Sequence, residues 1–383
     1  MTEIGSLEIL IGALFRFWPV WACLAVILGT SFYFRGRLGL YGHLFDSGVG
    51  FVGLTLVLFW LLTALFADVI ATFPPLEQFA LLKRAVPGTV EAETGIPLYF
   101  GADNLGRDLF SRMVHGSRFV LAIAPAATFV AYVVGITLGL PAGYFGGRID
   151  AVLSFIANLV LAFPVILLFY LLVTPGVRET AIPVFMAGLF FIFPIIFLGI
   201  LFHSRYAARP QIFWSLMAVT LVVGGWVYAG LVFDADPLGV FSLAPNELNI
   251  FAAVVFASSP GVFRIVRGLT MDIRTRDYVA AAQTRGERPA YIMLWEILPN
   301  ARGPLIVDAC LRIGYTTILL GTLGFFGLGL APESPDWGSM INQTRGFIRI
   351  VPTIVLPQTI AIATLVLGLN LLADGLREQS LKD

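Results

Sequence analysis

The stretch DYVAAAQTRGERPAYIMLWEILPN, residues 277–300, is a polar interruption in a strongly apolar chain. Apolar runs lie on both sides of it, at residues 248–265 and 304–324. The chain between Leu269 and Ala301 carries eight charged side chains. One charge at the centre of a bilayer costs about 2.5–3.5 kcal/mol, so eight would cost on the order of 20 kcal/mol. The stretch must therefore lie in water or against another protein, between two membrane spans.

The composition of the whole chain agrees with a membrane protein. Of its 383 residues 58% are hydrophobic and 13% are charged, whereas a soluble domain has roughly 25% charged residues. The net charge is zero and no basic face is available for a nucleic acid. Cys23 and Cys310 both lie in apolar runs, so no disulfide is expected. His43, His115 and His203 are far apart in the sequence, so no metal site is expected.

Nine segments are apolar and long enough to span a bilayer, which takes about 20 residues. We therefore expect an all-α polytopic membrane protein. The segments are residues 10–34, 49–70, 119–140, 151–173, 181–202, 213–233, 248–265, 304–324 and 353–372. We expect the first of them to be a membrane span and not a cleavable signal peptide, because Glu3 and Glu8 stand where a signal peptide has basic residues and because the apolar run is too long.

The distribution of arginine predicts the orientation of the chain. Arg35 and Arg37 follow the first span, so the positive-inside rule places the N-terminus outside and the next loop in the cytoplasm. Alternation then places the polar stretch and the C-terminal tail, with Arg377 and Lys382, in the cytoplasm. The long outside segment 71–118 has mixed charges, but long segments cross the membrane largely regardless of charge.

The polar stretch itself has the pattern of a short docking helix. Asp277 is expected to be its N-cap, and residues 278–285 would form about two turns. Gly286 can end the helix in the left-handed conformation, and Pro289 suits the first turn of a second helix that runs to Leu298. The alanines leave a smooth surface for a partner, and Arg285 and Arg288 can reach its carboxylates. The expected docking residues are Asp277, Tyr278, Ala280, Ala281, Ala282, Arg285, Gly286 and Glu287.

This stretch resembles the cytoplasmic loop of ABC importer permeases. Their signature is Glu-Ala-Ala, three residues, Gly, nine residues and a short motif that ends in Leu-Pro. The matching residues are Ala280, Ala281, Ala282, Gly286, Leu298 and Pro299, with Ala280 in the glutamate position. The resemblance implies a coupling helix that lies in a groove of a cytoplasmic ATPase subunit and moves when the ATPase dimer closes on ATP.

Further segments are similar to the oligopeptide/dipeptide/nickel permeases, second-subunit type. FGADNLGRDLFSRMVHGSR, residues 100–118, is similar to their Gly-Thr-Asp-x-x-Gly-Arg-Asp-x-x-Ser-Arg motif, with Ala102 in place of threonine. Residues 142–150, 161–164, 324–340 and 370–378 match other parts of the same branch. The motif before the third span contains Gly106, Arg107, Asp108, Ser111 and Arg112. The resemblance places it in the periplasm, near the docking site of a substrate-binding protein. The alternative is a structural role, in which Arg107 and Asp108 tie the loop to the membrane surface.

The resemblance also implies an organisation of the chain. A six-span permease core would be extended by about three extra transmembrane helices. We expect residues 1–48 to be an extra N-terminal helix and loop, and residues 49–383 to be the transmembrane permease domain. Within it we expect a periplasmic segment at 71–118, an inserted helix pair at 176–247 and the coupling loop at 269–303. The extra helices would pack on lipid or on a partner subunit, or would contact a regulatory protein.

A permease of this type would reside in the bacterial cytoplasmic (inner) membrane and work with other chains. The resemblance implies a homologous second permease, two ATPase subunits that hold ATP and Mg²⁺, and an extracytoplasmic substrate-binding protein. This chain itself has no G-x-x-x-x-G-K-[ST] loop for ATP, since its two lysines are Lys83 and Lys382. It also lacks G-x-S-x-G and H-E-x-x-H, so we expect no enzyme activity and no bound cofactor.

One pair of charges falls inside a predicted span. Asp308 and Arg312 are four residues apart, so they lie on one face of a helix and can pair. They would line the translocation path or contact the partner subunit, or would form a local pair near the cytoplasmic end. The alternative function is an ion-gradient-driven secondary transporter or channel, which predicts discontinuous helices and intramembrane carboxylates for ion coupling. Asp308 is the deep acidic candidate, and Arg312 would neutralise it. A non-transporting scaffold is a third alternative.

Overall fold

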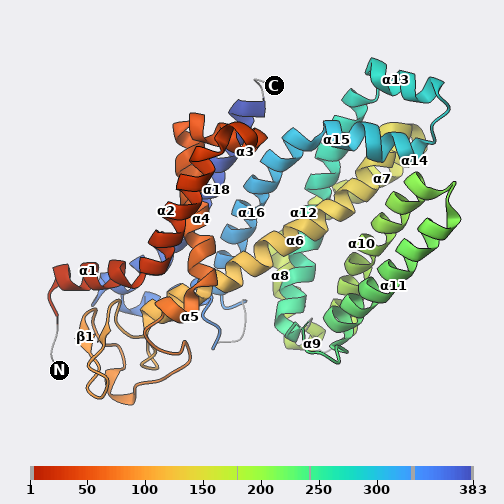
Figure 1. Cartoon of the computed structure of the whole chain (residues 1–383). Helices are drawn as coiled ribbons and strands as arrows, with labels where there is room; N and C mark the ends of the chain where they lie inside the picture. The colour runs from red at the N-terminus through yellow and green to blue at the C-terminus, as the bar shows by residue number, and fades with distance from the viewer. Residues whose placement is uncertain (1–3, 179, 241–242, 329–332, 381–383) are drawn as a thin grey trace. The chain divides into compact units, whose positions relative to one another are not determined.

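The structure, a computed structural model, describes residues 4–178, 180–240, 243–328 and 333–380. The chain divides into two compact units, one formed by Met1–Pro125 with Val307–Asp383 and the other by Ala126–Ile306. The long helices α6 (Leu109–Phe145) and α16 (Arg302–Phe325) each contribute residues to both units (Figure 1).

The remaining elements belong to one unit or the other. The first unit contains α1 (Ser6–Arg16), α2 (Trp18–Tyr33), α3 (Gly39–His43), α4 (Gly48–Leu65), α5 (Ala67–Ile70), β1 (Thr89–Val90), β2 (Pro97–Leu98), α17 (Trp337–Thr344), α18 (Leu356–Ser380) and the 3-10 turns Arg35–Arg37, Leu44–Asp46, Ala80–Leu82, Arg345–Phe347 and Pro352–Ile354. The second contains α7 (Gly147–Leu161), α8 (Val165–Val173), α9 (Pro175–Arg178), α10 (Ile182–Tyr206), α11 (Pro210–Phe233), α12 (Pro245–Ile273), α13 (Asp277–Thr284), α14 (Pro289–Tyr291), the π-helix η4 (Ile292–Ile297) and α15 (Leu298–Asn300).

The all-α polytopic fold expected from the sequence is confirmed. Among the described residues, seven helices are long and apolar enough to cross a membrane, and two bent helix pairs bring the number to as many as nine. Each of the nine apolar segments has a counterpart in these helices. The one sheet in the described chain is the two-residue pairing of β1 with β2, which lies in the long segment before α6.

Two predicted spans are not continuous helices, which corrects the expectation for residues 10–34 and 151–173. Helices α1 and α2 meet at Phe17 at an angle of 53°, and α7 and α8 meet at 73°. Proline explains both breaks, because it cannot donate a helical hydrogen bond and disfavours helix in the residue before it. Pro19 lies in the first turn of α2, and Pro164 is the N-cap of α8.

Glycines bring α4 and α18 into backbone contact in the first unit. A Cβ atom built on Gly53 would lie 2.3 Å from the backbone nitrogen of Leu372, and one built on Gly375 would lie 2.4 Å from the Cα of Gly50. Lipid tails are as apolar as leucine, so helices in a membrane associate through such close packing more than through the hydrophobic effect. The two helices therefore form a tight antiparallel pair.

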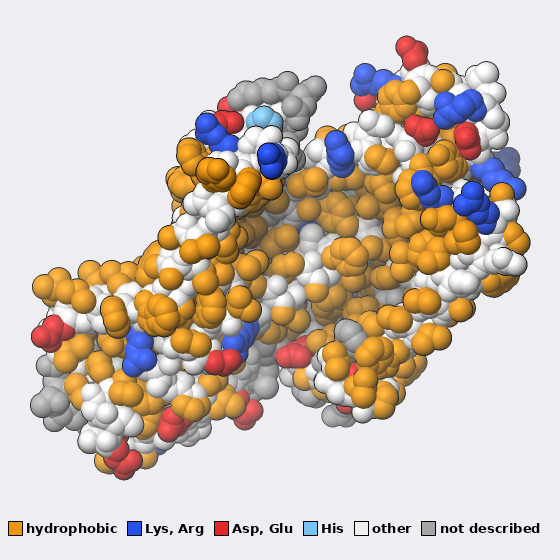
Figure 2. Space-filling model, viewed as in Figure 1, with side chains coloured by type: hydrophobic (Ala, Val, Ile, Leu, Met, Phe, Trp, Pro, Cys, Tyr) orange, Lys and Arg blue, Asp and Glu red, His pale blue; other side chains and the backbone are white. Residues whose placement is uncertain are grey.

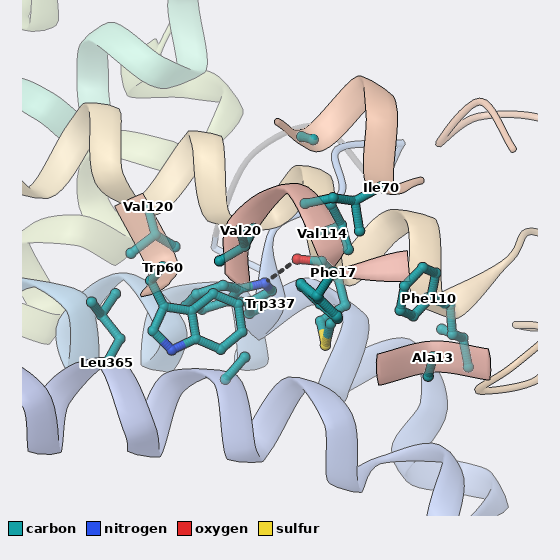
Figure 3. Packing of buried hydrophobic residues seen from close by; sticks show 14 of the residues in the cluster. Ala13, Phe17, Val20, Trp60, Ile70, Phe110, Val114, Val120, Trp337 and Leu365 are labelled. Atoms are coloured by element: carbon teal, nitrogen blue, oxygen red, sulfur yellow. Dashed lines mark hydrogen bonds between the residues drawn. The ribbon is translucent and has the colours of Figure 1, made fainter. Parts of the chain in front are cut away.

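Two tryptophans hold the buried core of the first unit together (Figure 3). The rings of Trp60 in α4 and Trp337 in α17 have centroids 5.0 Å apart and meet edge to face at 65°. Trp60 Nε1 donates to Thr364 Oγ1 at 3.0 Å, and Trp337 Nε1 donates to the carbonyl of Met113 at 2.8 Å. A buried indole usually needs such an acceptor, so these bonds fix how α4, α6, α17 and α18 pack.

The second unit has a glycine stripe of its own on α6. Gly135, Gly139 and Gly143 are four residues apart, and a Cβ atom on any of them would come within 3.0 Å of α12, with Val262 and Val266 opposite the first two. The constant spacing shows that α6 and α12 run parallel in register along this contact. Small residues repeated at every fourth position permit such close contact between membrane helices. Next to α12, α10 and α11 form a helical hairpin (Figure 1).

Candidate functional site

The predicted docking helix is present as α13 (Asp277–Thr284). Its N-cap is Arg276, whose backbone is extended, and Asp277 is already the first helical residue, so the prediction that Asp277 caps the helix is wrong. In the first turn, the Asp277 carboxylate still lies at the positive end of the helix dipole.

The C-terminal end of α13 follows the prediction. Gly286 has φ +78°, a left-handed backbone conformation that is unfavourable for residues with a Cβ atom. Its N–H donates to the carbonyl of Gln283 at 2.9 Å, and the N–H of Glu287 donates to that of Ala282 at 3.2 Å. These two bonds make the Schellman motif, which satisfies carbonyls at a helix end and stops the helix sharply.

One face of α13 is buried and the other is open. Val279 and Ala282 are buried on the side that contacts η4, whereas Tyr278, Ala280 and Ala281 are exposed. Two of the three alanines thus lie on the smooth surface that the sequence predicted. Figure 2 shows charged side chains gathered over α13 and the neighbouring α14–α15 segment. A partner surface can approach this face closely between flanking charges.

Arginines connect the polar loop to the rest of its unit. Arg285 pairs with Glu296 at 3.1 Å, within this chain, while Arg288 is exposed. Before α13, Arg274 donates to the carbonyls of Gly143 and Tyr144 at 3.0 and 2.9 Å, where α6 ends.

The same connection continues along α12. Arg267 forms two hydrogen bonds with the Asp150 carboxylate of α7, and Arg264 donates to Asn158 Oδ1 at 2.7 Å. Arg274 therefore fixes the loop to α6, and Arg264 and Arg267 fix the preceding helix α12 to α7. A displacement of α13 would reach α6 through Arg274 and α7 through α12.

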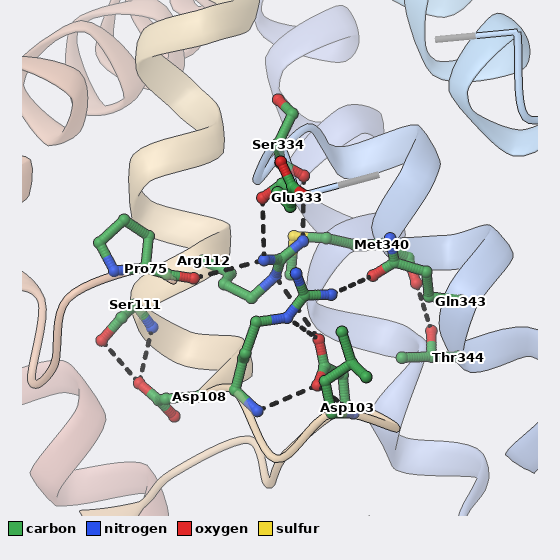
Figure 4. A network of polar contacts seen from close by, with 12 residues as sticks. Pro75, Asp103, Asp108, Ser111, Arg112, Glu333, Ser334, Met340, Gln343 and Thr344 are labelled. Atoms are coloured by element: carbon green, nitrogen blue, oxygen red, sulfur yellow. Dashed lines mark hydrogen bonds and ion pairs between the residues drawn. The ribbon is translucent and has the colours of Figure 1, made fainter. Parts of the chain in front are cut away.

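The motif before the third span lies in a buried polar network (Figure 4). The Asp108 carboxylate accepts from the backbone N–H and the hydroxyl of Ser111 at 2.8 and 2.6 Å, and from Thr72 Oγ1 at 2.9 Å. Burial raises the pKa of Asp108, and the hydrogen bonds from Ser111 and Thr72 partly oppose that change. Ser111 Oγ also accepts from the backbone N–H groups of Thr72 and Phe73, so this half of the motif holds the end of the α5 segment.

The two arginines of the motif share one carboxylate. Arg107 Nε lies 2.7 Å from Asp103 Oδ2, and Arg112 Nε lies 3.9 Å from the same atom. Arg112 also donates to the carbonyl oxygens of Glu333 and Ser334, at 3.3 and 3.0 Å. The three charged side chains are at most 2% exposed. Such a buried cluster binds the segment before α6 to the segment before α17.

Two further residues complete the motif's environment. Gln343 Oε1 in α17 accepts from Arg107 Nη2 at 3.0 Å. Gly106 has φ +81°, and a Cβ atom there would lie 2.2 Å from the carbonyl oxygen of Phe79. The side chains of the motif are thus enclosed by their own chain. The docking of a substrate-binding protein near the motif stays a prediction, and exposed residues around the motif would have to make that contact.

The predicted pair in α16 lies together as its spacing implies. Arg312 Nε is 2.6 Å from Asp308 Oδ2, and each side chain is 18% exposed. This contact is compatible with a pair that lines the translocation path or contacts the partner subunit, and also with a local pair near the cytoplasmic end. The function of the pair stays a prediction.

Sequence reasoning missed several contacts that organise these sites. Asp103 stands within the motif stretch but was not singled out, and Trp337 and Gln343 are more than 200 residues away from their partners. The glycines at 135, 139 and 143 could have been found by their spacing of four residues in an apolar run.

Comparison with known proteins identifies relatives over most of the chain. The sequence model of the family described as "Binding-protein-dependent transport system inner membrane component" matches residues 135–380. The dipeptide transport system permease protein DppC of Alkalihalophilus pseudofirmus is 28% identical over 338 residues, 88% of this chain and 87% of that protein. The di/tripeptide permease protein DppC of Pseudomonas aeruginosa is 28% identical, covering 85% of each chain. The glutathione transport system permease protein GsiD of Pectobacterium atrosepticum is 29% identical, covering 73% of this chain and 71% of that protein.

Proposed function

Because the chain belongs to the family of binding-protein-dependent transport system inner membrane components, we propose that it is the permease subunit that carries peptides inward in an ABC importer. The names of its dipeptide, tripeptide and glutathione relatives support short peptides as the substrate class. The chain is a multi-pass membrane protein of the inner membrane.

The observation that carries the mechanism is the geometry of α13. It is a short helix with two exposed alanines and a sharp glycine stop, and Gln283 within it and Arg274 just before it donate hydrogen bonds to the end of α6. We propose that it docks in a cytoplasmic ATPase subunit and transmits the closure of the ATPase dimer to the membrane helices. The lack of an ATP-binding loop in the sequence supports hydrolysis on those separate subunits.

The proposed assembly contains a second homologous permease, two ATPase subunits with ATP and Mg²⁺, and an extracytoplasmic binding protein. In the proposed orientation the N-terminus is outside, and α13 and the C-terminus are in the cytoplasm. The arginines beside α13 and after the first span support this orientation, because positively charged loops favour the cytoplasmic side.

Uptake by the reconstituted complex tests this function. We expect liposomes that contain the complex, with ATP inside and the binding protein and a labelled dipeptide outside, to accumulate the peptide. Accumulation should require both ATP and the binding protein and should persist when a protonophore collapses the proton gradient. Uptake that survives ATP depletion and stops with the protonophore would instead identify the ion-gradient-driven transporter.

A further inference from the structure

The inserted helix α10 (Ile182–Tyr206) reaches the loop that contains α13. The hairpin of α10 and α11 packs on α12 through α10, with the rings of Phe191 and Phe251 stacked at a centroid distance of 5.1 Å. At its C-terminal end, α10 also contacts α14, just after α13. The C-terminal end of α10 therefore connects the hairpin to the polar loop, at α14.

Beyond α14, the end of α10 also holds one indole ring, that of Trp295. Trp295 Nε1 donates to Ser204 Oγ at 3.0 Å, and the Ser204 hydroxyl in turn donates to the carbonyl of Leu201 at 2.7 Å. The Arg205 guanidinium lies 4.5 Å from the centroid of the same ring. A hydrogen bond at the ring edge and a cation over the ring face act in different directions, so together they fix the orientation of the indole.

Trp295 is part of η4, the π-helix Ile292–Ile297. A π-helical turn is rare and often occurs at functional sites. The next residue, Glu296, pairs with Arg285 at the end of α13. Two adjacent side chains of η4 thus join the end of α10 to the end of the proposed coupling helix.

We propose that the α10–α11 hairpin is a built-in brace for the coupling loop, with Ser204 and Arg205 as the positioning residues that hold Trp295. When α13 is displaced, the brace makes η4 and α10 move with it, so the displacement reaches α12 instead of bending the loop. This proposal rests on the proposed coupling role of α13.

The number of peptides transported per ATP hydrolysed tests the brace in the reconstituted complex. Arg205→Gln removes the cation from the ring. We expect it to lower this ratio about threefold, which corresponds to the free energy of one exposed cation–π contact. Arg205→Lys keeps the cation and should restore most of the ratio. Arg209→Gln makes the same change of charge at an exposed position between α10 and α11, and it should leave the ratio unchanged.

The hydrogen bond gives a second, independent readout. Ser204→Ala and Trp295→Phe each remove it, so each should lower the ratio, and the double variant should lower it no further than one of them. A ratio equal to that of the unchanged chain in Arg205→Gln and Ser204→Ala would overturn the brace while leaving the importer function intact. If the unchanged chain itself shows no ATP-coupled uptake, the coupling function and the brace are both wrong. Arg205 is exposed, so its variants should assemble even if a Trp295 variant does not.

Discussion

Replacing Ala281 by glutamate should lower ATP-driven peptide uptake at least about tenfold while the protein still inserts and folds. Ala281 is exposed on α13, so the new side chain has room in the isolated chain. Against an ATPase subunit, however, it would place an unpaired carboxylate in a closed interface. An unpaired buried charge in an interface costs about 2–5 kcal/mol, and every 1.4 kcal/mol is about tenfold. The measurement is initial uptake together with ATP hydrolysis in reconstituted liposomes.

Ala208→Glu is the matched control, because Ala208 is also an exposed alanine but lies between α10 and α11. It should retain the uptake of the unchanged chain. Gly286→Pro should act like Ala281→Glu, since proline requires φ near −65° and lacks the N–H that Gly286 donates to Gln283. Uptake within twofold of the unchanged chain in both variants would remove α13 from the mechanism.

Replacing Asp103 by alanine should destabilise the protein by about 3–5 kcal/mol, the usual effect of breaking a buried ion pair. Asp103 faces two buried arginines, Arg107 at 2.7 Å and Arg112 at 3.9 Å, and its loss would leave both without this carboxylate. The effect should be visible as a lower midpoint of thermal unfolding in detergent.

An exposed ion pair provides the comparison. Asp46 pairs with Arg35 at 3.3 Å, but both side chains are about half exposed, so Asp46→Ala should cost less than about 1 kcal/mol. Equal midpoints for the two variants would show that the network of Asp103 does not hold the fold of its unit. The pattern we predict would instead favour the structural role of the motif over a direct docking role.

Much of the fold could be predicted because the bilayer imposes it. A run of about 20 apolar residues has few alternatives to a spanning helix, so the nine segments were recognisable from composition alone. The breaks at Phe17 and before Pro164 were not predicted, although both prolines were visible. A proline inside an apolar run can kink, break or begin a helix, and only the packing around it decides among these outcomes.

In the candidate sites, local contacts could be predicted from the sequence and contacts between distant residues could not. The end of α13 was predictable because its hydrogen bonds are local, and glycine at position 286 permits a conformation that other residues disfavour. The contacts of Arg112 with the carbonyls of residues 333 and 334, and of Trp295 with Ser204, join residues far apart in the sequence. No local pattern encodes such contacts. For the same reason the pairing of Arg285 with Glu296 of its own chain was not predicted, and the contact of Arg285 with a partner stays a prediction.

Site-specific cross-linking from α13 tests the central claim most directly. A photoreactive amino acid at position 281 should give a covalent adduct with an ATPase subunit in the assembled complex, and the yield should change when ATP is added. The same group at position 92, an exposed site in the segment before α6, should give no such adduct. An ATPase adduct from position 92 but not from position 281 would contradict both the docking role of α13 and the proposed orientation.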